Sequence, residues 1–272
     1  MTERRNIAVL FDADNTPATL AEAVLEEVAT YGRIVVKRAY GNWSKPILSP
    51  WLGILNRLAI KAEQQTDYVS GKNATDIALI IDAMDLLYKN LYDAFVIVSS
   101  DSDFTPLAMR LHESGVFVIG VGESKTPVPF RNACDNFILL ENLNRGNASI
   151  SVTATSLDSS SRTPATKAET KQLHKMLTKA WISYQDEDGY CNVCSANSYL
   201  RRAKSDFDPR TFGAASLPQL LQRYPELYRV ERFPGKGTVT IVGFKCLNPN
   251  PTIMQEMEVS LENKNQTDIE NN

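Results

Sequence analysis

The 272-residue sequence lacks the features that identify an exported or membrane-spanning protein. It has no apolar run close to the roughly 18 residues that a membrane span needs. Its first residues, MTERRN, carry no apolar segment of a secretory signal. Four cysteines are too few for a disulfide framework, so we expect reduced thiols in a cytoplasmic protein. Two histidines and one Cys191-x-x-Cys194 pair are also too few to favour a four-ligand zinc site.

Charge is nearly balanced overall but unevenly distributed along the chain. The formal net charge is −3. Residues 1–150 carry a net charge of −4, residues 167–246 carry +5, and residues 247–272 carry −4. A mildly acidic first part, a basic second part and an acidic end indicate that the parts do different work. Charge alone does not identify the partner of the basic part.

The first 145 residues alternate short apolar segments with helical patterns. The segments with β-rich composition are NIAVLF (6–11), RIVVKRAY (33–40), TDYVS (66–70), AFVIVSS (94–100), VFVIGVG (116–122) and FILL (137–140). Helical patterns lie between them, at 16–32, 49–65, 73–90 and 104–115. Alternation of this kind predicts an α/β fold, a doubly wound parallel sheet with helices on both faces.

A second unit follows a segment that cannot build a core. Between Ser149 and Thr166, 10 of 18 residues are Ser or Thr, so we expect residues 146–166 to be a flexible linker. Residues 167–246 contain three helical patterns and two β-rich segments around the turn PGKG, which together predict a winged helix. Residues 247–272 are polar and acidic, and we expect them to be disordered.

Acidic residues follow the apolar segments of the first unit. Asp12 and Asp14 lie in LFDADNTPATL, Asp101 and Asp103 lie in SSDSDF, and Asp76 begins the helical pattern after SGKNAT. The carboxyl ends of parallel strands share one edge of a sheet, so we expect these acids to converge. A single Asp there is usually a helix cap. Five together favour a site for Mg²⁺ or Mn²⁺ that hydrolyses a phosphodiester with activated water.

The spacing Asp12-x-Asp14-x-Thr16 also fits haloacid-dehalogenase-type phosphatases, in which the first Asp is a nucleophile. That chemistry needs a Ser or Thr after a second strand, a Lys, and then another acidic pair. Here Ser99 and Ser100 directly precede Asp101, with no Lys between them. The phosphatase is therefore only a remote alternative.

The segments FDADN, AYGNW, GKNATDIALIIDAM and VIVSSDSDFTPLAMRLHESGVFVIGVG resemble the NYN domain, a PIN-like ribonuclease family. The resemblance covers about residues 5–143 and implies a PIN-like fold with a metal-dependent ribonuclease site. It implies four acidic residues that are both catalytic and metal-binding, with two supporting residues beside them. The acids are Asp12, Asp76, Asp101 and Asp103, and the supporting residues are Asn15 and Ser100. Asp82 lies six residues beyond Asp76 on the same helix, and we assign it to structure.

Two further residues of this unit are candidates for RNA contact. Lys72 precedes the Asp76 turn, where its ammonium group could meet a phosphate oxygen. Trp43 follows the second strand and could stack on a base. A solvated loop lysine and a tryptophan that covers a neighbouring loop are the alternatives.

The second unit resembles the LOTUS or OST-HTH domain, a winged-helix module of RNA-associated proteins. The segments that carry the resemblance are DGYCNVCSANSYL and FDPRTFGAASLPQLLQRYPELYRVE. It implies binding to RNA, single-stranded or structured, or to a protein partner such as a helicase. Cations that could hold phosphates are Arg201, Arg202, Lys204, Arg210 and Lys236.

Two functions from different classes fit the sequence. One is a divalent-metal-dependent endoribonuclease whose winged helix recruits RNA. The other is a non-catalytic scaffold that binds RNA or a protein through the same fold. Cleavage of labelled RNA with Mn²⁺ or Mg²⁺, compared with EDTA, discriminates between them.

Overall fold

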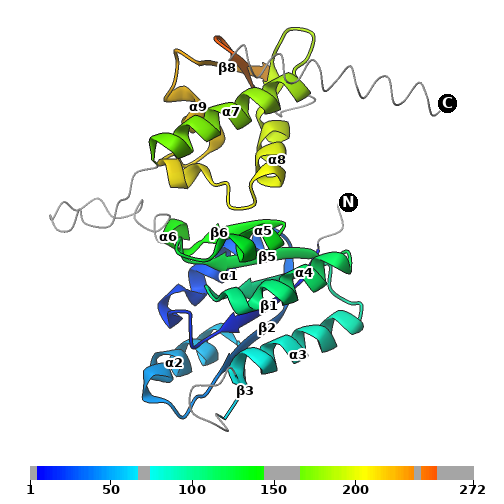
Figure 1. Ribbon diagram of the computed structural model, residues 1–272, viewed down its shortest axis with the longest axis vertical. Coiled ribbons are helices and arrows are strands. Elements are labelled where there is room, and N and C mark those ends of the chain that lie inside the picture. Colours follow the sequence, from blue (N-terminus) through cyan, green and yellow to red (C-terminus); the bar gives the residue numbers. More distant parts are fainter. Residues whose placement is uncertain (1–4, 67–73, 144–165, 236–239, 250–272) are drawn as a thin grey trace, which may run out of the picture. The chain divides into compact units, whose positions relative to one another are not determined.

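The computed structural model describes residues 5–66, 74–143, 166–235 and 240–249 (Figure 1). The chain separates into two compact units, Met1–Ala154 and Thr155–Asn272. The first is a parallel α/β unit and the second combines helices with an antiparallel sheet, so the predicted fold class is confirmed. The predicted linker limits, 146 and 166, stay predictions, because residues 144–165 lie outside the described part of the chain. In the parts that are described, no helix is both long and apolar enough to span a bilayer.

The first unit is built on a six-stranded parallel sheet with the order β3-β2-β1-β4-β5-β6. The strands are β1 (Asn6–Asp12), β2 (Arg33–Gly41), β3 (Lys61–Gln64), β4 (Ala94–Val98), β5 (Phe117–Gly122) and β6 (Asn136–Leu139). Strand β1 lies between β2 and β4, and Phe11 is in register with Val98. The residues that follow β1 and β4 therefore leave the sheet side by side at its carboxyl edge.

Helices cover both faces of this sheet (Figure 1). One apolar cluster joins Ile7, Val9 and Phe11 of β1 to α1 (Ala21–Ala29), α2 (Ser49–Leu58) and α6 (Leu140–Leu143). The alternate residues Ala8 and Leu10 pack with α3 (Ala74–Tyr88), α4 (Thr105–Glu113) and α5 (Val128–Ala133). Strand side chains point to opposite faces in turn, so β1 is buried on both. Short 3-10 helices are η1 (Ala18–Leu20), η2 (Pro46–Leu48) and η3 (Ser102–Phe104).

The helix predicted over 49–65 is too long. Helix α2 ends at Leu58, and Ala59 follows in the left-handed conformation with φ of 51°. The amide of Ile60 donates to the carbonyl oxygen of Leu55 at 2.9 Å, which closes the helix end. Residues Lys61–Gln64 then form β3 at the edge of the sheet, where the sequence pattern indicated helix. The strand predicted at 66–70 falls almost entirely outside the described residues.

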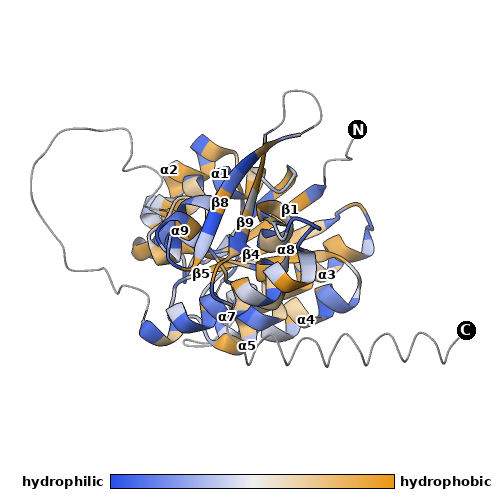
Figure 2. Cartoon of the chain, turned by 90° about the horizontal axis from the view of Figure 1, so that it is seen from above, coloured by the Kyte–Doolittle hydropathy of each residue, from blue (hydrophilic) through white to orange (hydrophobic). Residues whose placement is uncertain are grey.

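The second unit packs three helices on a small antiparallel sheet. Its elements are α7 (Lys167–Tyr184), β7 (Cys191–Asn192), α8 (Val193–Ala203), η5 (Pro209–Phe212), α9 (Leu217–Gln222), β8 (Tyr228–Pro234) and β9 (Thr240–Cys246). Thr166 and Glu169 form a capping box at the start of α7. In Figure 2 the helices carry both hydrophobic and hydrophilic residues, as helices with one buried face do. Gly213 has φ of 76°, which explains glycine at the end of η5.

All four cysteines are free thiols. Cys134, Cys191 and Cys246 are buried, and burial raises the pKa of each thiol, to about 12, about 11 and about 12 respectively. Cys191 and Cys194 lie in different elements. Cys191 lies in β7, and Cys194 is exposed in the first turn of α8.

Candidate functional site

Asp12 is a buried carboxylate at the end of β1, with no exposed surface. Its Oδ2 atom accepts hydrogen bonds from Ser99 Oγ at 2.7 Å and from Asn15 Nδ2 at 2.8 Å. The backbone N–H of Asn15 donates to Asp12 Oδ1 at 3.3 Å. Burial raises the pKa of Asp12 and the Asp14 charge adds to this, while the bonds from Ser99 and Asn15 oppose the shift. These donors orient the carboxylate without supplying a positive charge.

The loop after β4 is tied to Asp12 through Ser99. The Asp101 amide donates to Ser99 Oγ at 3.1 Å, and Ser99 Oγ donates in turn to Asp12. Asp101 caps η3, where its Oδ1 accepts from the Asp103 amide at 2.9 Å. Asp101 is half-buried and Asp103 is exposed. Two aspartates are thereby fixed at the carboxyl edge beside Asp12.

Ser99 is a site residue that the sequence prediction missed. Ser100 was predicted to support the site, and its Oγ accepts from the Glu123 amide at 2.9 Å, so it holds the loop after β5 instead of contacting Asp12. The register of β1 with β4 indicates that Ser99, and not Ser100, lies next to Asp12. Phe11 pairs with Val98, so the next residues, Asp12 and Ser99, leave adjacent strands together.

Asp76 brings a third segment to this edge. It lies in the first turn of α3 and is half-buried. Burial, and then the charges of Asp12, Asp101, Asp103 and Asp14 in that order, raise its pKa to about 6. Like charges act on one another in this way only when they lie close together. Asp76 therefore lies within electrostatic range of four acids from two other segments. That Asp12, Asp76, Asp101 and Asp103 act together as catalytic residues stays a prediction.

The donor set suits a hard divalent cation. Every candidate ligand is a carboxylate oxygen, the type that Mg²⁺ and Mn²⁺ prefer. A cation would also relieve the mutual repulsion that raises the pKa of Asp76. Within the described residues, however, no three acidic, His or Cys side chains already stand at ligand spacing. These acids would have to move closer together to share one ion.

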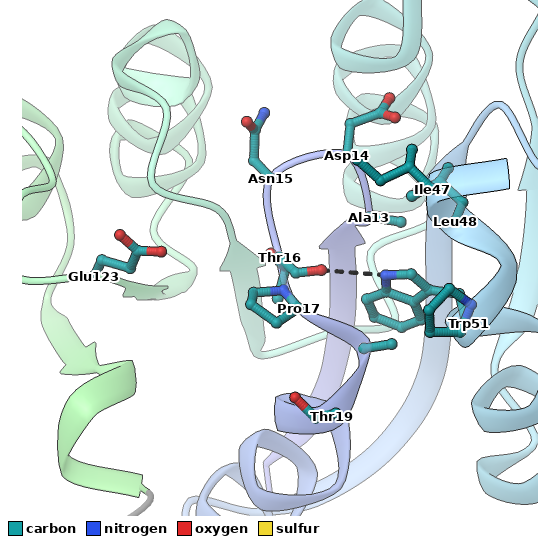
Figure 3. A pocket seen from close by; sticks show the side chains of 12 residues that line it. Ala13, Asp14, Asn15, Thr16, Pro17, Thr19, Ile47, Leu48, Trp51 and Glu123 are labelled. Atoms are coloured by element: carbon teal, nitrogen blue, oxygen red, sulfur yellow. Dashed lines mark hydrogen bonds between the residues drawn. The ribbon is translucent and has the colours of Figure 1, made fainter. Parts of the chain in front are cut away.

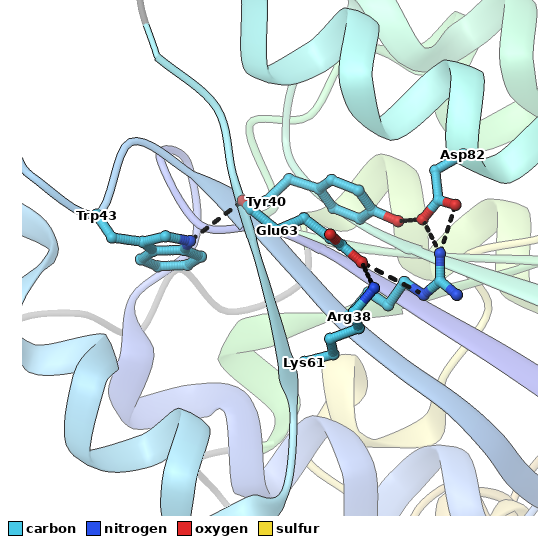
Figure 4. A network of polar contacts seen from close by, with 6 residues as sticks. All are labelled: Arg38, Tyr40, Trp43, Lys61, Glu63 and Asp82. Carbon is cyan, nitrogen blue, oxygen red and sulfur yellow. Dashed lines mark hydrogen bonds and ion pairs between the residues drawn. The ribbon is translucent and has the colours of Figure 1, made fainter.

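Asp82 belongs to a separate network on the same helix (Figure 4). Its carboxylate accepts from the Arg38 guanidinium and from the Tyr40 hydroxyl, both on β2. Glu63 pairs with Lys61 at 2.6 Å and with Arg38 at 3.7 Å. The network joins α3 to β2 and β3, which matches the assignment of Asp82 to structure.

Trp43 is engaged within the first unit. Its Nε1 atom donates to the carbonyl oxygen of Glu63 at 3.1 Å, and its ring meets the Trp51 ring edge-on at 6.5 Å between centroids (Figure 4 shows Trp43 beside Glu63). The Trp43 ring is half-buried. These contacts fit the alternative interpretation, in which Trp43 covers a neighbouring loop. Stacking on a base stays a prediction. Lys72 and Lys236 lie outside the described residues.

Several predicted cations of the second unit contact groups of their own unit. Arg210 Nη2 pairs with Asp208 Oδ2 at 2.7 Å, and Lys204 pairs with Asp206 at 3.4 Å. Arg202 is exposed and donates to the Tyr184 hydroxyl at 2.9 Å. Arg201 is half-buried in α8. Arg202 is therefore the most accessible of the described candidates.

A pocket of about 480 Å³ opens beside the acidic cluster. The loop from Ala13 to Thr19 runs through it, with Glu123 on one side and Ile47, Leu48 and Trp51 on the other (Figure 3). Trp51 Nε1 donates to the carbonyl oxygen of Thr16 at 3.1 Å. No sequence pattern predicted this pocket.

Comparison with known proteins identifies both units. The model of the NYN domain matches residues 6–141, and the model of the OST-HTH/LOTUS domain matches residues 165–240. No match was found among the curated proteins. A crystal structure of a Vibrio parahaemolyticus protein of unknown function is similar at 22% identity and a TM-score of 0.42, covering 51% of this chain and 94% of that one. A solution structure of an uncharacterized Nitrosomonas europaea protein is similar at 18% identity and a TM-score of 0.28, covering 37% and 93%.

Proposed function

This chain belongs to the NYN domain family, and we propose that its first unit is a divalent-metal-dependent endoribonuclease that hydrolyses RNA phosphodiesters. NYN domains belong to a PIN-like nuclease family, and the OST-HTH/LOTUS unit implies RNA binding. The observation that supports the proposal is the hydrogen-bonded link from Asp12 through Ser99 to the Asp101 amide at one edge of the sheet. The charges of Asp12 and Asp101 also act on Asp76 and raise its pKa.

Each acid has a distinct part in this proposal. Asp12, held by Ser99 and Asn15, is the fixed ligand about which the site is organised. Asp76, Asp101 and Asp103 complete the oxygen ligands of Mg²⁺ or Mn²⁺. A bound cation supplies activation of the attacking water and stabilisation of the leaving oxygen. When that cation is not bound, Asp76, with its pKa raised to about 6, is mostly protonated only below that pH.

We propose that the second unit holds RNA through phosphate contacts, with Arg202 the most accessible of its described cations. Such contacts carry no sequence choice and weaken as salt rises. The unit would raise the concentration of substrate near the acidic edge, because both belong to one chain. A protein partner at this unit is the alternative.

The direct test incubates the purified full chain with labelled single-stranded and structured RNA in Mn²⁺, in Mg²⁺ or in EDTA. We expect internal cleavage with either metal and none in EDTA. An Asp101→Asn variant should lose cleavage, whereas Asp85→Asn, a change at an exposed acid of α3, should keep it. Cleavage that persists in Asp101→Asn belongs to a contaminant.

A non-catalytic scaffold is the second candidate. The observation that favours it is the absence, within the described residues, of three ligands already at metal spacing. An intact, folded chain that binds RNA but never cleaves it, with any metal, would establish the scaffold and refute the nuclease.

A further inference from the structure

The pocket beside the acidic edge has a fixed floor. Trp51 is 2% exposed, and its ring meets Phe11 of β1 at 5.6 Å between centroids. The carbonyl oxygen of Thr16 accepts from the Trp51 indole at 3.1 Å, and Thr16 Oγ1 donates to the carbonyl oxygen of Val98 at 3.2 Å. Strands β1 and β4 and helix α2 therefore hold this floor in place, so a ligand would meet a preformed surface.

The walls of the pocket are mostly apolar. Pro17, Pro50, Leu48 and Trp51 contribute flat or branched carbon surface, and the Ile47 side chain stands at the rim with 80% of its surface exposed. A volume of about 480 Å³ lies in the range of small-molecule sites, about 300–1,000 Å³. None of the described residues that line it is a Lys or Arg. A phosphate group would find no cation there, whereas an uncharged planar group would be well covered.

The polar groups at the pocket are mainly hydrogen-bond acceptors. Asp14 and Glu123 both line it, and the Glu123 carboxylate also pairs with Lys125 at 2.6 Å. Asn15 lines the pocket too, and its amide group bonds Asp12 at 2.8 Å. The pocket therefore begins at the residues next to the proposed metal ligand. Carboxylates accept hydrogen bonds from exocyclic amino groups such as the N4 of cytosine.

We propose that this pocket takes the nucleobase next to the scissile phosphate of RNA, and that it favours cytosine, adenine and guanine over uracil. The first three bases present an amino group that can donate to Asp14 or Glu123. Uracil presents two carbonyl oxygens and one N–H, so carboxylates would face its acceptors. The inference rests on the proposed function, because that function places an RNA phosphate at Asp12.

A binding test separates this inference from catalysis. The chain has three tryptophans, Trp43, Trp51 and Trp181, so ¹⁵N-labelled indole groups give three N–H signals. The full chain in EDTA is titrated with CMP, AMP, GMP, UMP and ribose 5-phosphate. We expect the Trp51 signal to shift with the first three nucleotides at lower concentrations than with UMP. Trp181, in the other unit, should not move with the same concentration dependence.

Two variants test the walls and the acceptors separately. Ile47→Ala should weaken CMP binding by about 4-fold, the effect of losing roughly one methylene of apolar contact. The matched change Ile77→Ala, at an isoleucine 57% exposed on α3, should leave CMP affinity unchanged. Asp14→Asn should reduce the ratio of CMP to UMP affinity by about 5-fold, the lower end of one base-specific contact.

The outcomes distinguish the two proposals. Equal affinity for all four nucleotides, a Trp51 shift produced by ribose 5-phosphate, or no shift at 10 mM nucleotide (roughly ten times a weak Kd of 1 mM) would overturn base recognition. Selective Trp51 shifts in a chain that never cleaves RNA would overturn the nuclease and leave the pocket as a base-binding site. In an active enzyme, cleavage sites should be poor in uracil at one position beside the cut, and Asp14→Asn should reduce that bias.

Discussion

Two buried aspartates, one in each unit, differ in how their charge is met. Asp208 of the second unit is 8% exposed, caps η5, and pairs with Arg210 at 2.7 Å. Asp12 of the first unit has no exposed surface and accepts from the neutral donors Ser99 and Asn15. Arg210 donates hydrogen bonds to Asp208 and also neutralises its negative charge. Ser99 and Asn15 donate hydrogen bonds to Asp12 but do not neutralise its charge. A buried acid organised in the second way, among other acids, is suited to a cation from solution.

Exchange of each aspartate for asparagine should give the largest contrast. Asp12→Asn should lower single-turnover RNA cleavage by at least about 100-fold, as loss of a group that stabilises transition-state charge does. Without metal it should raise the unfolding free energy, because burial disfavours the Asp12 charge. Asp208→Asn should leave cleavage of bound RNA unchanged and lower the unfolding free energy by about 1.5–3 kcal/mol. Cleavage assays and urea unfolding measure both, and a loss of cleavage in Asp208→Asn alone would reverse the comparison.

Metal should stabilise one unit only. Mn²⁺ at 100 times its dissociation constant should raise the unfolding free energy of the first unit by about 2.7 kcal/mol. The second unit, which uses Arg210 for its buried acid, should not respond. Unfolding followed by tryptophan fluorescence in a Trp181→Phe variant reports on the first unit, where both remaining tryptophans lie. Equal stabilisation in Asp12→Asn would mean that the metal binds elsewhere.

Removal of the second unit should separate binding from turnover. Deletion of residues 167–246 should raise the KM for RNA by about 10-fold or more and leave kcat within about 2-fold, because bound RNA would still meet the same acids. The steep loss of affinity with salt should become shallower in the truncated chain. Affinity measurements between 50 and 200 mM salt, the range over which counterion release is pronounced, check this. An unchanged KM would assign the second unit to a protein partner.

The smallest effect should be an opposite response of the two units to pH. The folded pKa of Asp76 is raised from 3.8 to about 6, so the first unit should lose stability as pH rises through that interval. Burial lowers the pKa of His174 below its ordinary 6.5, so the unfolded second unit binds the proton more readily and this unit should lose stability as pH falls through 6.5. Urea unfolding of Trp181→Phe at pH 5 and 7 follows the first unit, and calorimetry of the full chain follows both. If the unfolding free energies of both units changed in the same direction with pH, Asp76 and His174 would not be the groups that set the response.

The edge of the sheet was predictable because strand ends carry strong sequence signals. Asp12 and Asp101 follow uninterrupted apolar segments, and parallel strands deliver their ends to one edge. Asp76 could be added because it begins the helical pattern that follows the loop SGKNAT. The charge of Asp12 is among the causes that raise the pKa of Asp76, but a shared site for the two acids stays a prediction.

The features that the sequence did not predict depend on single residues that have no local sequence pattern. Ala59 adopts a left-handed conformation that sequence rules assign to Gly or Asn, so the end of α2 at Leu58 was invisible. Ser99 and Ser100 are identical side chains, and only the register of Phe11 with Val98 decides which one reaches Asp12. The pocket beside Trp51 needs the fold itself, because its walls come from residues that no motif groups.

The bond from Ser99 to Asp12 joins residues 87 positions apart in the chain. A polypeptide that emerges from the ribosome holds Asp12 almost from the start, yet it cannot orient that carboxylate until β4 has been synthesised and has paired with β1. Translation therefore sets the earliest moment at which the acidic edge exists.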